Sequence, residues 1–294
     1  MKAGVGTREH CKLIYGRVFW ILLDLSKAFD MLNYRTIIET VNCDVVTKRA
    51  LCSFLTGCQV KIGRESSIFC RRGVRQGGLL SPFLFNEIAN EFLLKIANTK
   101  SGLGLLLGYA DDFLPISPSA KWISEVIDLF LDFCQEKGLL VNPTKCKAMC
   151  SSTIAFSKSG AARPEFKIGN EVLPYADSAR YLGFTLNSTL SSDLHMRSTL
   201  SSFRKAIFSF KTTVRTRKRS LLLKFAKIFI IPKLHNLEFV EKITNANVSR
   251  FDYLLCKYFS VKSNSELEKI RSGYSWLYLH KLHYVARRRY TEDF

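Results

Sequence analysis

The sequence has no long hydrophobic run, and this limits where the protein can act. Among its 294 residues, no apolar stretch of the roughly 18 residues that a membrane-spanning helix needs is free of charge. No hydrophobic region follows Met1-Lys2-Ala3-Gly4, so no signal peptide is expected. Hydrophobic residues nevertheless make up 47% of the chain, which is sufficient for ordinary globular cores. We therefore expect a globular intracellular protein, either nuclear or cytoplasmic, that does not contact a membrane.

The nine cysteines lack the spacing of a metal site. No Cys-x-x-Cys pair occurs, and the closest pair, Cys146 and Cys150, has no adjacent histidine, so no zinc is expected. An odd number of cysteines in a chain of this size favours reduced thiols over a secreted disulfide framework.

Acidic residues are scarce, and their scarcity is uneven. Lys and Arg number 44 against 25 Asp and Glu, a formal charge of +19. Residues 197–294 alone hold 21 basic and 7 acidic residues, which is +14 of that total. Such a one-sided excess indicates a nucleic-acid partner, with a merely solvated surface as the alternative.

Three aspartates stand out against this basic background. Asp111 and Asp112 are adjacent at a predicted hairpin tip, and Asp24 ends an apolar run that predicts a buried central strand over residues 18–25. Hard divalent cations prefer oxygen ligands, and two such ions can activate an attacking hydroxyl and stabilise a leaving oxygen. This arrangement predicts a two-metal phosphoryl-transfer site. A lone Asp-Asp pair is otherwise a common solvated turn.

Hydrophobic periodicity predicts strands at the front of the chain and helices at the back. Ser81 and Pro82 predict the N-cap and first residue of a helix that runs to about Asn98 and buries Leu84, Ile88, Phe92 and Ile96. A second helix is predicted over residues 121–137, with Gly138 ending it. Other predictions are two short helices in residues 33–55, a hairpin over 59–69 that turns at Gly63-Arg64, a hairpin over 102–117, strands at 146–154, 165–167, 171–173 and 180–186, and helices after about residue 190.

Five short segments in order carry a family resemblance. They are Asp24-Leu25-Ser26-Lys27-Ala28-Phe29-Asp30, the Gln76-Gly77-Gly78 loop, Tyr109-Ala110-Asp111-Asp112, Gly138-Leu139-Leu140-Val141-Asn142-Pro143-Thr144-Lys145 and Tyr181-Leu182-Gly183. Their order and spacing resemble palm motifs A to E of the reverse transcriptases of LINE-type (non-LTR) retrotransposons.

The resemblance implies a fold and a domain order. The fold is of the α+β class, a reverse-transcriptase palm with an antiparallel sheet and helices on one face, followed by a mainly helical thumb-like region. Residues 1–17 are expected to be a remnant of a fingers region, residues 18–189 the palm, and residues 190–294 the basic thumb. A complete fingers region is not expected in the 23 residues before Asp24.

The resemblance also implies a reaction and its residues. The activity is RNA-directed DNA synthesis with an RNA template, a DNA primer and dNTPs, and the cofactor is Mg²⁺ as two ions, with Mn²⁺ as the alternative. Asp24, Asp111 and Asp112 are the expected catalytic residues and metal ligands. Lys145 is the expected proton donor to pyrophosphate, although Lys147 lies close enough to compete for that role. The other contacts that the resemblance implies are Phe29 (as a steric gate against the 2′-hydroxyl), Ala28, Gln76, Gly77 and Tyr109 for nucleotide and template, and Tyr181, Leu182 and Gly183 as the primer-grip turn. The basic cluster itself indicates nucleic-acid backbone contacts at Arg215, Arg217, Lys218 and Arg219, with a solvated face as the alternative.

Pro115 departs from the expected pattern. It falls in the strand that follows the Asp pair, where a missing N–H weakens the ladder. Together with the short segment before Asp24, it leaves open a catalytically inactive retrotransposon-derived fragment that binds nucleic acid. An intron-maturase-like reverse transcriptase, which would share the palm motifs, is the other alternative.

Overall fold

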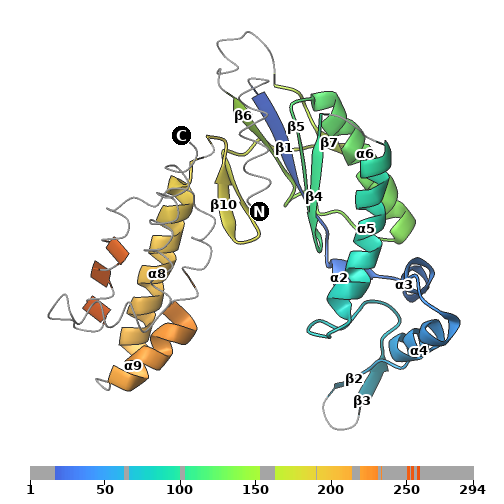
Figure 1. Ribbon diagram of the computed structural model, residues 1–294, viewed down its shortest axis with the longest axis horizontal. Coiled ribbons are helices and arrows are strands. Elements are labelled where there is room, and N and C mark those ends of the chain that lie inside the picture. The colour runs from blue at the N-terminus through green and yellow to red at the C-terminus, as the bar shows by residue number, and fades with distance from the viewer. Residues whose placement is uncertain are drawn as a thin grey trace, which may run out of the picture. The chain divides into compact units, whose positions relative to one another are not determined.

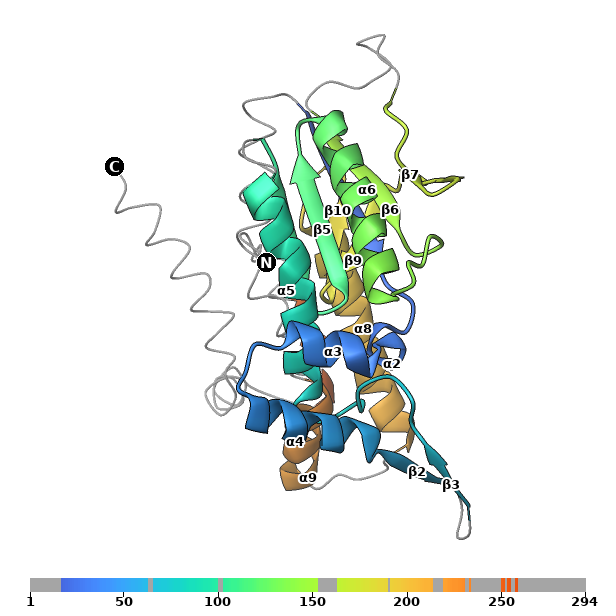
Figure 2. The ribbon, with the colours of Figure 1, turned by 90° about the vertical axis from the view of Figure 1, so that its right-hand side faces the viewer.

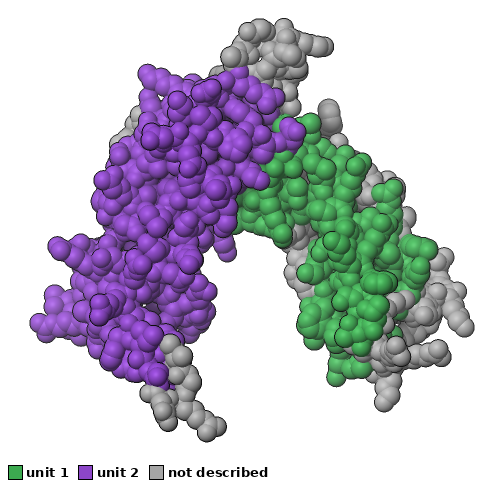
Figure 3. Space-filling view, turned by 180° about the vertical axis from the view of Figure 1, so that it is seen from behind, with its two compact units in different colours: residues 1–2, 178–294 green, residues 3–177 purple. Residues whose placement is uncertain are grey.

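The computed structural model describes residues 17–62, 66–99, 103–152, 163–189, 191–213 and 219–230, with residues 233, 250, 251, 253, 254, 257 and 258. The chain divides into two compact units, one of residues 3–177 and one of residues 178–294 with residues 1–2 (Figure 3). Residues 178–189, expected with the palm, thus group with the C-terminal unit. In the ranges that are described, no helix combines the length and the apolar character needed to cross a membrane.

A four-stranded antiparallel sheet forms the centre of the 3–177 unit, with the spatial order β4-β5-β1-β6 (Figure 1). The strands are β1 (Arg17–Asp24), β4 (Leu105–Tyr109), β5 (Asp112–Ser117) and β6 (Lys147–Ser152). Residues 18–21 of β1 are at most 3% exposed. The predicted buried central strand ending at Asp24 is therefore confirmed.

Two helices, α5 (Ser81–Thr99) and α6 (Ala120–Lys137), lie side by side on one face of this sheet (Figures 1 and 2). All four apolar positions predicted to be buried in α5 are buried. Helix α6 starts where the Ser119 hydroxyl accepts from the N–H of Trp122, and it ends at Gly138, whose φ of 67° is left-handed. The α+β class and the antiparallel sheet with helices on one face are confirmed.

The predicted N-cap of α5 is wrong by one residue. The carbonyl of Leu80 accepts the helical N–H of Leu84, so Ser81 is already the first helical residue. Its hydroxyl donates to the carbonyl of Arg75 instead of accepting from the helix. A serine hydroxyl at a helix start can donate to a carbonyl of the preceding loop or accept from a helical N–H, and the sequence does not distinguish these two hydrogen bonds.

Short elements complete this unit. Asp44 caps the helix that follows it by accepting from the N–H of Thr47 at 3.0 Å, which produces the predicted break between two helices. The predicted turn at Gly63-Arg64 lies outside the described residues. The elements are α2 (Ala28–Met31), α3 (Tyr34–Thr40), α4 (Val45–Thr56), β2 (Gln59–Ile62), β3 (Ser66–Phe69), β7 (Lys167–Ile168) and β8 (Glu171–Val172).

Pro115 lies in an interior strand, paired with Leu106 of β4 on one side. On the other side, the β1–β5 register pairs Trp20 with Ile116 and Leu23 with Phe113. Within these described strands, no pair is formed at the positions between them, which include Pro115. Proline has no N–H to donate to a ladder, which explains the gap opposite Pro115. The pairing resumes at Asp24 and Asp112.

In the unit of residues 178–294, a hairpin precedes helices. The elements are β9 (Ser178–Tyr181), β10 (Phe184–Asn187), α8 (Asp193–Thr213), α9 (Arg219–Phe225) and the π-helix η1 (Ala226–Ile230). The single strand predicted over residues 180–186 is wrong, because Leu182 (φ 47°) and Gly183 (φ 78°) form a two-residue turn inside it. Buried His195 of α8 accepts from the N–H of Thr185 through Nδ1 at 3.2 Å and stacks on Phe184. This contact fixes the hairpin to α8.

Candidate active site

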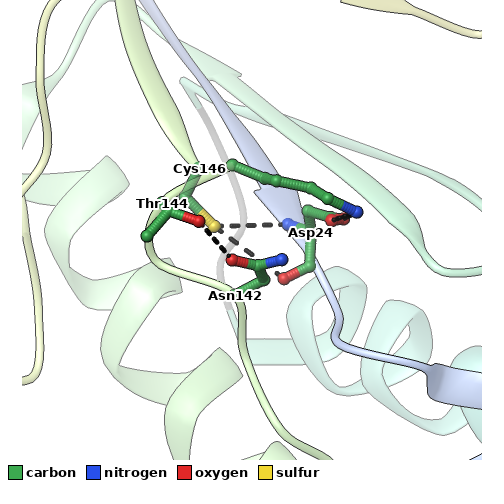
Figure 4. Close-up of polar contacts among 5 residues, drawn as sticks. Asp24, Asn142, Thr144 and Cys146 are labelled. Atoms are coloured by element: carbon green, nitrogen blue, oxygen red, sulfur yellow. Dashed lines mark hydrogen bonds and ion pairs between the residues drawn. The ribbon is translucent and has the colours of Figure 1, made fainter.

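Asp24 lies at the end of β1, where a neighbouring loop holds its backbone (Figure 4). Its N–H donates to Sγ of buried Cys146 at 3.3 Å, and its carbonyl accepts from the N–H of Asn142 at 2.9 Å. One residue on, Leu25 forms a β-bridge with Val141. The backbone of Asp24 is therefore fixed on both sides, and its side chain is 17% exposed.

Asp24 and Asp112 are cross-strand partners in the β1–β5 register. Directly opposed residues of an antiparallel pair have Cβ atoms about 4.5–5.5 Å apart. Leu23 and Phe113, the neighbours of the two aspartates, point into the helix-covered core. Because side chains alternate along a strand, both carboxylates project from the opposite face of the sheet.

Asp111 joins this pair through a tight turn. The β4–β5 register pairs Tyr109 with Asp112, so Ala110 and Asp111 alone form the connection, and Ala110 takes a left-handed φ of 50°. Tyr109 is 65% exposed beside them. A two-residue turn with a positive φ matches the twist of a hairpin and keeps the adjacent carboxylates at its tip.

The three carboxylates lie close enough to influence one another electrostatically. Partial burial, followed by the negative charges of Asp111 and Asp24 and against a smaller lowering by Lys145, raises the pKa of Asp112 to about 6. Like charges near one another disfavour joint ionisation. A cation at this edge would relieve the repulsion.

Lys145 is the lysine that reaches the carboxylates. Its Nζ lies 3.1 Å from Oδ1 and 3.5 Å from Oδ2 of Asp24, and its side chain is 66% exposed. Lys147 instead lies within β6, in register with Leu22. Among the described residues, the geometry thus favours Lys145 over Lys147 for the role that sequence left open.

Helix α2, which follows β1, is tied to the loop before α5. The carbonyl of Phe29 accepts from the N–H of Val74 at 2.8 Å, and Nε2 of Gln76 donates to Oδ1 of Asp30 at 3.3 Å. Gly73 has a φ of 84°, and a Cβ there would lie 2.8 Å from the carbonyl oxygen of Asp30. Only glycine allows this approach without strain.

These contacts also place the residues expected to bind nucleotide. The ring of Phe29 is partly exposed and stacks on Phe85 of α5, with centroids 4.9 Å apart. Ala28 is buried, whereas Gln76 and Gly77 are exposed. The structure brings Phe29 and Gln76 to one region of the unit, and their roles remain predictions.

The residues expected to bind primer and backbone lie elsewhere in the chain. Tyr181, Leu182 and Gly183 form the end and the turn of the β9–β10 hairpin in the other compact unit. Arg219 is the first residue of α9. Arg215, Arg217 and Lys218 lie outside the described residues.

Sequence reasoning missed two residues that support the site. Cys146 holds the backbone of Asp24, and no local pattern marks a cysteine as such a partner. Asp30, in α2, accepts from Gln76 in the loop before α5, and its position six residues after Asp24 does not predict that contact.

The side chains as they stand do not form a ready metal cage. Among the described residues, no group of three or more His, Cys, Asp or Glu side chains is arranged to hold an ion. The donor chemistry fits a hard divalent cation, because the carboxylates supply oxygen and repel one another. Mg²⁺ keeps several waters and needs only one or two carboxylates, so the fit does not require a closed cage.

Comparisons with known proteins agree with these observations. A family model described as reverse transcriptase (RNA-dependent DNA polymerase) matches residues 3–186. A Pol polyprotein of the type-1 retrotransposable element R2 from Popillia japonica is 26% identical over 186 residues, 58% of this chain and 31% of the relative. The RNA-directed DNA polymerase of the mobile element jockey from Drosophila funebris is 24% identical over 221 residues, 70% of this chain and 24% of the relative.

Among solved structures, a telomerase from Candida albicans in complex with the TWJ fragment of telomeric RNA aligns with a TM-score of 0.49 at 12% identity. The alignment covers 92% of this chain and 54% of that one. The chain spans less than a third of the length of the curated relatives named above.

Proposed function

Because the chain belongs to the reverse transcriptase family, we propose that it carries the nucleotidyl-transfer centre of an RNA-directed DNA polymerase from a non-LTR retrotransposon. The proposed substrates are an RNA template, a DNA primer and dNTPs. The observation that carries the proposal is the position of Asp24, Asp111 and Asp112 at the same end of the central strands β1 and β5. Asp24 and Asp112 are cross-strand partners there.

The proposed cofactor is Mg²⁺, as two ions, with Mn²⁺ as a substitute. Asp24, Asp111 and Asp112 would hold these ions through carboxylate oxygens. When bound, such ions would supply activation of the primer 3′-hydroxyl and stabilisation of the leaving oxygen. The backbone contacts of Asp24 with Cys146 and Asn142 keep its carboxylate in place as charge changes around it.

Lys145 supplies the positive charge on the leaving-group side. Its ammonium now pairs with Asp24, and its exposed side chain is long enough to follow a departing pyrophosphate. It stabilises the negative charge that develops there and can donate a proton to the leaving oxygen.

Phe29 and Gln76 position the incoming nucleotide and the template. Stacking on Phe85 limits the freedom of the Phe29 ring, so the ring can exclude a 2′-hydroxyl from a sugar bound over it. Gln76 and Gly77 precede α5 in an exposed loop whose left-handed glycine permits close approach of a backbone or base.

The primer and the backbone are proposed to contact the C-terminal unit. The turn at Leu182-Gly183 joins two paired strands and is only partly buried, which leaves backbone accessible for a primer contact. The basic excess of residues 197–294 supplies phosphate contacts.

A second candidate is nucleic-acid binding without catalysis. The observation in its favour is the gap in the β1–β5 ladder opposite Pro115, three residues from Asp112. A ladder weakened at that point holds the two catalytic strands less firmly.

Primer extension on an RNA template separates the two candidates. The wild-type chain is expected to extend a DNA primer with Mg²⁺ or Mn²⁺, and Asp111→Ala is expected to abolish the product. Asp132→Asn is the matched control, because Asp132 is an exposed residue of α6 away from the sheet edge. No product at any metal concentration, from a chain that still binds a primer–template duplex, favours the second candidate.

A further inference from the structure

Two cysteines face each other at the base of the β2–β3 hairpin, outside the carboxylate edge. Cys58 precedes β2 and Cys70 follows β3, one step beyond the registered pair Gln59 and Phe69. The N–H of Cys70 donates to the carbonyl of Cys58 at 2.9 Å. Figure 2 shows this hairpin continuing from α4. The two residues are therefore opposed as the next rung of the hairpin.

This placement meets the Cα-distance requirement of a disulfide. Opposed residues of antiparallel strands have Cα atoms about 4.5–5.5 Å apart, inside the usual disulfide range of about 4.4–6.8 Å. Each thiol also shifts the pKa of the other, as neighbouring thiols do. Both are free, with Cys58 8% exposed and Cys70 partly exposed.

Arg75 distinguishes the two thiols. Its Nε donates to Sγ of Cys58 at 3.2 Å. This contact, the largest cause, lowers the pKa of Cys58, whereas the hydrogen bond with Cys58 raises the pKa of Cys70. Tyr34, the remaining titratable neighbour, donates its hydroxyl to the carbonyl of Cys70. Thiolate character therefore concentrates on Cys58.

The other thiol pair of this unit offers a contrast. Burial raises the pKa of Cys134 to about 12 and that of Cys146 to about 11. Buried thiols without a cationic partner are inert. Cys52 is exposed on α4 and serves as a reference thiol.

We propose that Cys58 and Cys70 form a redox site whose substrate is hydrogen peroxide, with Cys58 as the thiol that reacts first and Cys70 as the one that resolves it. The Cys58 thiolate attacks the peroxide, the O–O bond breaks, and Cys58 becomes a sulfenic acid while the leaving hydroxide takes a proton to form water. The Cys70 sulfur then attacks Cys58, the S–O bond breaks, and a second water leaves as the disulfide forms. Two thiols supply the two electrons that reduce one hydrogen peroxide to two waters, and an added dithiol reverses the step.

The disulfide affects the neighbouring loop. Oxidation changes the Cys58 sulfur to which Nε of Arg75 donates, and Arg75 begins the loop that carries Gln76 and Gly77. Its carbonyl accepts from the N–H of Gly78 and from the Ser81 hydroxyl, so a shift of Arg75 reaches the start of α5. Oxidation should therefore change amide hydrogen exchange in residues 73–80.

Hydrogen peroxide and peptide mass spectrometry test the proposal. The wild-type chain is expected to lose two hydrogen atoms and give a Cys58–Cys70 linked peptide that dithiothreitol reverses. In Cys70→Ser, dimedone should trap a sulfenic acid at Cys58, whereas Cys58→Ser should leave Cys70 largely unlabelled. Cys52→Ser should behave as wild type. Linked peptides that involve Cys52 or Cys43 at comparable yield, or sulfenic acid mainly at Cys70, would overturn the proposal.

Iodoacetamide labelling tests the role of Arg75 without relying on the cysteine variants. At pH 7, Arg75→Leu is expected to slow alkylation of Cys58 several-fold, with Arg72→Leu as the matched control, since Arg72 is an exposed arginine of the same segment. Circular dichroism of each variant identifies any that fails to fold, and the wild-type rates of Cys58 and Cys52 are compared in any case. A wild-type Cys58 that alkylates more slowly than Cys52, or an unchanged rate in Arg75→Leu, would contradict the assignment.

Discussion

Replacing Asp112 by asparagine is expected to stabilise the metal-free fold at neutral pH. Asp112 is held near Asp24 and Asp111, and partial burial with these charges raises its pKa from 3.8 to about 6. A folded-state pKa above the unfolded value means that the folded form prefers the protonated carboxyl. The stabilisation that protonated Asp112 gives the folded state is complete below the unfolded pKa and is lost as pH rises through about 6.

The magnitude follows from the size of the shift. One pKa unit corresponds to about 1.4 kcal/mol, so a shift of roughly two units sets an upper limit near 3 kcal/mol. Because Asp112 is only partly buried, solvent screening reduces this to about 1–2 kcal/mol. Asp112→Asn removes the charge and should raise the free energy of unfolding by that amount at pH 7.5, and by much less at pH 4.

Urea unfolding followed by circular dichroism, in buffer with a chelator, measures this difference at pH 4, 6 and 7.5. The wild type should lose stability relative to Asp112→Asn across the interval from pH 4 to 6. Asp132→Asn, an exposed control on α6, should show no such pH-dependent gain. A variant that is less stable than the wild type at pH 7.5, or equally shifted at all three pH values, would refute the electrostatic reasoning.

Three further predictions concern the loops and the basic region. Gly73→Ala should lower the free energy of unfolding, measured in urea, by about 1–3 kcal/mol, because the left-handed φ and the 2.8 Å approach to Asp30 leave no room for a methyl group. Gly138→Ala, which has open space around the added methyl group, should lower the free energy of unfolding by less. Phe29→Val should admit ribonucleotides in single-nucleotide incorporation, and an unchanged preference for dNTPs would remove Phe29 as the gate. Neutralising Arg217, Lys218 and Arg219 together should flatten the log–log salt dependence of duplex binding by up to about three units, because each lost phosphate contact removes about 0.9 from the slope; equal slopes would identify a solvated surface.

Elements with a strong local signal were predictable from the sequence. The continuous apolar run before Asp24 indicates an interior strand, and β1 is such a strand. Gly138 ends α6 because its left-handed φ is unfavourable for other residues. The approach of Asp24 to Asp112 followed from placing one at a strand end and the other at a hairpin tip.

Features that depend on distant contacts were not predictable. The bond from Asp24 to Cys146 spans 122 residues, and the Cys58–Arg75 contact depends on how a hairpin returns to its base. The turn at Tyr181-Leu182-Gly183 was predicted only through the family resemblance, because a leucine with positive φ has no local signature and the flanking apolar residues were interpreted as one strand. The boundary near residue 178 depends on the β9–β10 hairpin packing with α8, a tertiary choice.

The central claim is that Asp24, Asp111 and Asp112 form a divalent-cation site, and calorimetric titration with Mn²⁺ tests it most directly. The wild-type chain should bind Mn²⁺, and Asp112→Asn should bind it at least about tenfold more weakly, which is about 1.4 kcal/mol, although the same change stabilises the metal-free fold. Asp112→Asn should therefore weaken Mn²⁺ binding while it raises the free energy of unfolding of the metal-free chain. Equal Mn²⁺ affinity in the wild type, Asp112→Asn and the Asp132→Asn control would contradict the claim.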